Sequence, residues 1–179
     1  MRFATILLLV MLSACTMKAP PYQASVENIQ PLKLAKVKPL SVGEFNSTKK
    51  LDSISLRGTR LVSPSGTYGI YLTKAIEEEL KLAKLWSGVS STVVSGTLIR
   101  NNIDISEFST GTGDISVNFI VTTDGKVVYE RIISADHVFD SSFMGSIAIP
   151  NGQSNYMNLV QKLIKNLFSD KAFIDAING

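Results

Sequence analysis

The chain has 179 residues, of which 45% are hydrophobic and 18% are charged, and its formal net charge is +3. This length and apolar content suffice for one domain with a core of its own. The small net charge, with no dense basic run interleaved with aromatic residues, excludes nucleic-acid binding from the functions that we expect.

The N-terminus carries the single cysteine of the chain. A basic start is followed by an apolar run that ends in Leu12-Ser13-Ala14-Cys15. The run is too short to span a bilayer, which takes about 20 residues, and it predicts a signal peptide over residues 1–14. Its end resembles the lipobox of bacterial lipoproteins, in which the cysteine is acylated. The alternatives are an ordinary cleaved secretory signal and a buried helix.

The lipobox resemblance implies a compartment and an anchor. Acylated Cys15 would bind membrane lipid, and two acyl chains give stable anchoring where one is marginal. In Gram-negative lipoproteins an aspartate directly after the acylated cysteine marks retention, so if the source is Gram-negative, Thr16 implies the periplasmic leaflet of the outer membrane. Acylation also accounts for a lone cysteine in an exported protein.

Residues 15–39 predict a flexible tether, and residues 40–179 a single globular domain. The tether has no helical periodicity and is interrupted by four prolines: Pro20, Pro21, Pro31 and Pro39. Three lysines of this segment either stay solvated or touch anionic lipid: Lys33, Lys36 and Lys38.

Residues 40–45 and 54–62 predict strands that form either a hairpin or one long strand with a bulge. Whether residues 40–45 join the main sheet stays open. Three further strands follow over residues 92–99, 115–122 and 127–134, with a bulge or bend expected near the end of the first. Asp124-Gly125 is a strong hairpin signal. The hairpin pairs Phe119 with Glu130 if the loop has two residues, or with Arg131 if it has three and a bulge.

Residues 68–86 predict an amphipathic helix, capped by Ser65 or Thr67, whose apolar stripe is interrupted by Glu79. A carboxylate on that stripe must be paired, hydrogen-bonded or shifted in pKa. It forms either a structural ion pair with an arginine or a contact to a ligand or partner. The candidate arginines are Arg57, Arg100 and Arg131.

Residues 136–152 predict a long apolar connection, which either packs onto the domain or binds a partner. Its candidate partner-binding residues are Phe139, Phe143, Met144, Ile147 and Ile149. Residues 155–168 then predict a second amphipathic helix, and a last short helix capped by Ser169 or Asp170 ends near Ile177.

The sequence predicts no enzyme, no cofactor and no metal site. The chain has one histidine, His137, and its neighbouring serines and aspartates lie on the same segment, which rarely gives triad geometry. The carboxylates are scattered singly, and the mature chain offers no free thiol as a metal ligand.

The element order predicts an α+β fold: a two-layer sandwich of a mostly antiparallel sheet of four or five strands, with two amphipathic helices on one face. The order of the helix containing residues 71–80, the hairpin with Asp124-Gly125-Lys126 and the closing helix resembles small envelope lipoproteins. These include the lipopolysaccharide-assembly lipoprotein and the auxiliary lipoproteins of ABC-type transporters. The resemblance implies a non-enzymatic partner in an envelope assembly or transport complex. The alternative is a binding module for a lipid or other small amphiphile, held in a cavity between helices and sheet.

Overall fold

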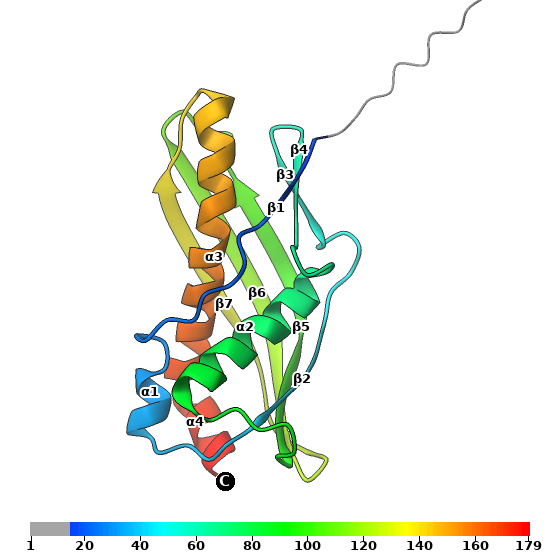
Figure 1. The fold of residues 1–179 in the computed structure, drawn as a ribbon, viewed down its shortest axis with the longest axis vertical. Coiled ribbons are helices and arrows are strands. Elements are labelled where there is room, and N and C mark those ends of the chain that lie inside the picture. Colours follow the sequence, from blue (N-terminus) through cyan, green and yellow to red (C-terminus); the bar gives the residue numbers. More distant parts are fainter. Residues whose placement is uncertain (1–14) are drawn as a thin grey trace, which may run out of the picture.

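The computed structural model describes residues 15–179 and confirms the predicted α+β class. Its main sheet has four strands in the order β2-β5-β6-β7, and helices α2 and α3 cross the same face of it (Figure 1). A second sheet of three strands has the order β1-β4-β3. Each sheet is mixed, because β2 runs parallel to β5 and β1 runs parallel to β4. The elements are β1 (Thr16–Lys18), α1 (Gln30–Leu34), β2 (Ser41–Asn46), β3 (Ser53–Leu56), β4 (Thr59–Val62), α2 (Tyr68–Ala83), β5 (Thr92–Asp104), β6 (Thr110–Thr123), β7 (Lys126–Asp140), α3 (Gly145–Ser169) and α4 (Lys171–Asn178).

Strand β6 forms the centre of the core, because every second side chain of it is buried under the helices. The β6–β7 hairpin turns at Asp124 and Gly125, which both have the positive φ angles (51° and 76°) of a two-residue turn. A bulge next to Val121 then shifts the register, so Phe119 lies opposite Arg131. The pairing of Phe119 with Arg131 is therefore observed, as expected for the alternative with a bulge. The loop nevertheless has two residues, because the additional residue lies in the bulge of strand β7.

The segment before α2 differs from both sequence alternatives. Strand β2 joins the main sheet at its edge, whereas residues 53–62 fold back on themselves as a separate β3–β4 hairpin. The hairpin turns at Arg57 and Gly58, with φ angles of 48° and 88°. Since arginine rarely adopts a positive φ, this turn lacks the usual sequence signal.

Helix α2 begins as predicted at the cap residue Thr67, whose side chain accepts a hydrogen bond from the backbone N–H of Ile70. It ends at Ala83, three residues before the predicted end, because Lys84 adopts the left-handed conformation with φ of 61°.

The long connection predicted over residues 136–152 is wrong. Strand β7 continues to Asp140, and α3 begins at Gly145 with Pro150 inside it. A proline costs the helix one hydrogen bond. Packing compensates for that loss, because Ala148 and Gly152 are buried, the latter close to Ile103 and Ile105 of the sheet side.

The flexible tether predicted over residues 15–39 is not observed either. Strand β1 pairs with β4, and the side chains of Ile29 and Leu32 are completely buried. The physical reason is the hydrophobic effect, because an extended tether would leave these two apolar side chains in water, whereas here both are shielded from it. None of the helices in the described part of the chain, residues 15–179, is both long and apolar enough to cross a membrane.

Candidate functional site

Cys15 is exposed and lies at the turn end of the β3–β4 hairpin. Its carbonyl oxygen accepts a hydrogen bond of 2.9 Å from the backbone N–H of Arg60, and Thr16 lies opposite Arg60 in the parallel pairing. The backbone at Cys15 is therefore part of the folded domain. The predicted signal peptide, residues 1–14, lies outside the described residues.

Glu79 is completely buried, and its partners come from the N-terminal segment, residues 15–39. One carboxylate oxygen, Oε1, accepts three hydrogen bonds: from the Tyr22 hydroxyl at 2.5 Å, the Ser25 backbone N–H at 3.1 Å and the Asn28 side-chain amide at 2.9 Å. The Glu79 side chain thus connects helix α2 to three residues of the N-terminal segment. We call these four residues the Glu79 cluster.

The predicted ion pair between Glu79 and an arginine is wrong. Arg57 donates to the backbone carbonyls of Ile105 and Phe143. Arg100 pairs with Asp114, and Arg131 pairs with Asp170 at 3.1 Å. The three donors of the N-terminal segment occupy the place that an arginine would take. They have no periodic pattern, which is why sequence reasoning missed them.

The electrostatics of the Glu79 cluster are dominated by burial. Loss of water around the carboxylate raises the pKa of Glu79, and the hydrogen bonds from Tyr22, Ser25 and Asn28 lower it by less. Burial and the nearby carboxylate likewise raise the pKa of Tyr22, so its hydroxyl stays protonated and donates.

Further hydrogen bonds fix the N-terminal segment along α2 and α3. The Tyr71 hydroxyl donates to the carbonyl of Pro20 at 3.0 Å. From α3, the side-chain amides of Gln153 and Gln161 donate to the backbone carbonyls of Lys18 and Gln23, at 2.6 and 2.8 Å. Together with the hydrogen bond at Cys15, these contacts attach the N-terminal segment to the domain.

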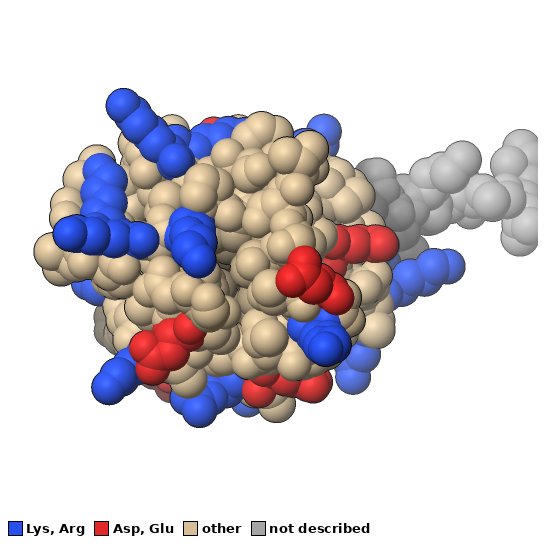
Figure 2. Space-filling model, turned by 90° about the horizontal axis from the view of Figure 1, so that it is seen from below, with Lys and Arg blue, Asp and Glu red and all other residues tan. Residues whose placement is uncertain are grey.

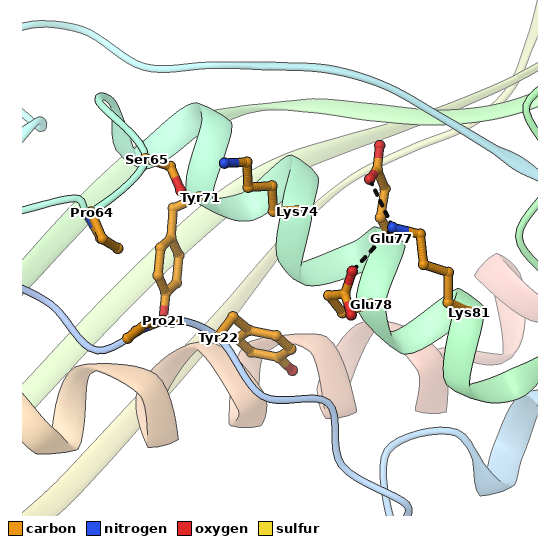
Figure 3. A pocket seen from close by; sticks show the side chains of 9 residues that line it. All are labelled: Pro21, Tyr22, Pro64, Ser65, Tyr71, Lys74, Glu77, Glu78 and Lys81. Atoms are coloured by element: carbon orange, nitrogen blue, oxygen red, sulfur yellow. Dashed lines mark hydrogen bonds and ion pairs between the residues drawn. The ribbon is translucent and has the colours of Figure 1, made fainter.

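A pocket of about 500 Å³ lies between the N-terminal segment and the outer side of α2 (Figure 3). The rings of Tyr22 and Tyr71 lie beside it, and Lys81 on its rim contacts Glu77 and Glu78 at 3.4 and 3.0 Å. It is lined by Pro21, Tyr22, Pro64, Ser65, Tyr71, Lys74, Glu77, Glu78 and Lys81. The alternative function, a binding module, predicts a ligand cavity between helices and sheet, but there Tyr68, Tyr71 and Tyr156 pack ring against ring, with centroids 4.7 to 6.3 Å apart.

The five candidate partner-binding residues fall into two groups. Phe139 and Ile149 pack against the core. Phe143, Met144 and Ile147 are exposed, at 70%, 59% and 46% of their surface.

Sequence reasoning missed a fourth exposed residue at the same place. Phe108, 75% exposed, stacks on Phe143 with ring centroids 5.2 Å apart. The available signal is a lone aromatic among the serines, threonines and glycines between the strands predicted over residues 92–99 and 115–122. We call Phe108, Phe143, Met144 and Ile147 the aromatic tip.

His137 lies on β7, where its Nε2 atom is 2.9 Å from the side-chain oxygen of Asn155 and its ring stacks near Phe139. Its hydrogen-bond partner is therefore an amide of α3. Within residues 15–179, no three His, Cys, Asp or Glu side chains come together as they would around a metal ion.

Comparison with known proteins gives a likeness of fold. No protein-family model matches the chain, and no curated protein matches it. A protein of the DUF330 family from Xanthomonas campestris superposes with a TM-score of 0.59 at 12% identity, over 89% of this chain and 96% of that one. An uncharacterized protein gives 0.50 at 9% identity, over 84% and 96%. A minor lipoprotein from Acinetobacter baumannii gives 0.47 at 14% identity, over 76% and 91%.

Proposed function

We propose that the protein is a lipoprotein of the bacterial cell envelope that acts as a non-enzymatic partner in an envelope assembly or transport complex. The observation that carries the proposal is the position of Cys15. It follows Leu12-Ser13-Ala14 in the sequence, and it is exposed at one end of the folded domain, where acyl chains could enter a membrane without disturbing the core. In a Gram-negative source, Thr16 in place of aspartate favours the periplasmic leaflet of the outer membrane.

The partner would bind the face of the main sheet that the helices leave open. The side chains of Ile99, Ile132 and Val138 are exposed there, among serine, threonine and asparagine. The edge of β7 is less accessible, because Lys162 and Asn166 of α3 donate to its carbonyls at Asp136 and Ser134. Side chains on the open face, more than backbone pairing at the edge, would then recognise the partner.

Affinity capture of the acylated protein from detergent-solubilised membranes tests this proposal. We expect an envelope protein to co-purify, and we expect Ile132→Lys to reduce its recovery. Val89→Lys is the matched control, because Val89 is equally apolar and 95% exposed in the loop before β5. Cys15→Ala should move the protein from the membrane to the soluble fraction. Equal recovery with both lysine variants would rule out the open sheet face.

The pocket beside α2 supports a second candidate function, the binding of a small amphiphile. Its volume is in the range of ligand pockets, and it combines tyrosine and proline side chains with the cation of Lys74. A fluorescent fatty acid should then bind saturably, and Ser65→Trp, which fills the pocket, should abolish binding. Absence of saturable binding to the wild type would end this candidate.

A further inference from the structure

The structure fixes Cys15 relative to the rest of the domain. A flexible tether would let the domain take any orientation above a membrane. Instead, the hydrogen bond from Arg60 holds the Cys15 carbonyl, and β1 continues that pairing to Lys18. A lipid on Cys15 would therefore enter the membrane at one defined place on the surface of the domain.

That place is next to the aromatic tip. Arg60 is three residues from Arg57, a backbone path of at most about 11 Å. The Arg57 guanidinium donates to the carbonyl of Phe143 at 2.7 Å and to that of Ile105 at 2.6 and 3.0 Å. Arg57 thus ties the hairpin beside Cys15 to both loops that carry the aromatic tip. Figure 1 shows the start of β1, the β3–β4 hairpin and the start of α3 at the same upper end of the molecule.

The aromatic tip groups its exposed apolar side chains: two stacked phenylalanines, a methionine and an isoleucine. The opposite end, with α1 and α4, carries basic and acidic side chains around its rim (Figure 2).

Three lysines of the N-terminal segment are exposed in and after α1, at that far end: Lys33, Lys36 and Lys38. Of the two alternatives for these lysines, solvation therefore fits the anchor position and lipid contact does not.

We infer that the aromatic tip inserts into the headgroup region of the same membrane that holds Cys15. This inference rests on the proposed lipid anchor and adds an orientation to it. Phenylalanine and other large apolar side chains bury favourably at the boundary between headgroups and acyl chains. Because the anchor already holds the domain at the membrane, insertion of the aromatic tip becomes an intramolecular step. For a short connection the effective concentration of the tip at the membrane is in the millimolar range, so a weak affinity of its four side chains for lipid suffices for insertion.

Quenching of tryptophan fluorescence by brominated acyl chains tests the orientation. The acylated protein is reconstituted in vesicles of phosphatidylethanolamine and phosphatidylglycerol, in a Trp86→Phe background that removes the single native tryptophan. One reporter is Phe143→Trp. The matched control is Leu34→Trp, because Leu34 is an apolar residue, 82% exposed, in α1 at the far end.

We expect Phe143→Trp to be quenched about two-fold or more strongly than Leu34→Trp, with an emission shift to shorter wavelength. Equal quenching of the two reporters in vesicle-bound protein would overturn the inference and leave the tip to a protein partner. Flotation with the vesicles is measured in the same samples, with Cys15→Ala as control. Failure of the acylated protein to float would instead count against the proposed anchor.

Discussion

At the scale of single residues, Glu79 connects the N-terminal segment to the domain. All three of its donors come from residues 22–28, and its second oxygen, Oε2, is buried without a hydrogen-bond partner among the described residues. Burying a carboxylate with only one hydrogen-bonded oxygen costs free energy of folding. The three hydrogen bonds offset part of this cost, and they hold the segment that begins at Cys15.

Glu79→Gln should lower the free energy of unfolding by about 1 to 2 kcal/mol, because the glutamine places an amide with two donors where Oε2 has no partner. Urea denaturation followed by circular dichroism measures the change. Glu78→Gln is the control, since Glu78 forms only an exposed pair with Lys81, and it should cost about 0 to 0.5 kcal/mol. Equal losses in both variants would contradict a structural role for Glu79.

The pH dependence of the same comparison follows from the raised pKa of Glu79. Between its ordinary pKa of 4.5 and its higher pKa in the fold, the folded state binds more protons than the unfolded state. The free energy of unfolding of the wild type therefore falls as pH rises through this window. Since Glu79→Gln lacks the titrating group, the stability gap between wild type and variant should be largest at acid pH and narrow above the window. A gap that widens with pH would contradict the raised pKa.

The burial of Glu79, unlike its partners, could be read from the sequence. The helical stripe through Leu72, Ile76 and Leu80 places position 79 inward, whatever contacts it there. Its partners lie more than 50 residues earlier, in a segment without periodic pattern. Local sequence patterns do not tell whether the partner of Glu79 is an arginine on the sheet or a tyrosine in an irregular segment, because the answer depends on how the segments pack in three dimensions.

At the scale of elements, α2 and β2 meet closely at Gly69. A side-chain carbon at this position would overlap the carbonyl oxygen of Phe45, and the Gly69 backbone N–H donates to the hydroxyl of Ser47 at 3.2 Å. Only glycine allows this approach of helix to strand. The parallel pairing of β2 with β5 depends on it, because α2 covers β2.

Gly69→Ala should therefore destabilise the fold by about 3 kcal/mol through overpacking, seen as a lower midpoint of thermal unfolding. The control is Gly145→Ala at the start of α3, where an added carbon meets only the end of Ile149 at 3.9 Å. That change should be neutral or stabilising by up to about 1 kcal/mol. If Gly69→Ala melted like the wild type, the close approach would be wrong.

Elements with a strict period could be predicted, and the others could not. Strand β6, helix α2 and the second half of α3 follow the alternation or stripe of their side chains. The first half of α3 contains Gly145, Pro150 and Gly152, which indicate a loop in any local analysis. Its buried face uses Ala148 and Gly152, two small residues that carry almost no hydrophobic signal.

At the scale of the whole molecule, the N-terminal segment and the aromatic tip are both products of distant contacts. Phe108 and Phe143 come from different loops and meet only because β6 and β7 are long enough to bring both to one end. The segment over residues 15–39 has the prolines of a linker, yet Ile29 and Leu32 are buried. A sequence analysis restricted to local patterns has no means of finding either.

Hydrogen–deuterium exchange should show that the N-terminal segment is protected as part of the domain. In the wild type we expect slow exchange over residues 16–34. In Glu79→Ala, exchange should rise over residues 16–28 while β6 stays protected, because the cluster stabilises the segment locally. A uniform rise over the segment and β6 would mean that the variant unfolds globally and that the cluster has no local role.

The pairing of β1 with β4 has a mechanical consequence. Strand β1 has three residues, and if Cys15 carries the proposed lipid anchor, a membrane that pulls on it would load the few hydrogen bonds of β1 first. Residues 16–39 number 24, and fully extended they would reach roughly 80 Å. The packed segment thus holds against the domain a length of chain that an extended tether would expose, and the hydrogen bonds of the Glu79 cluster are among the contacts that keep it there.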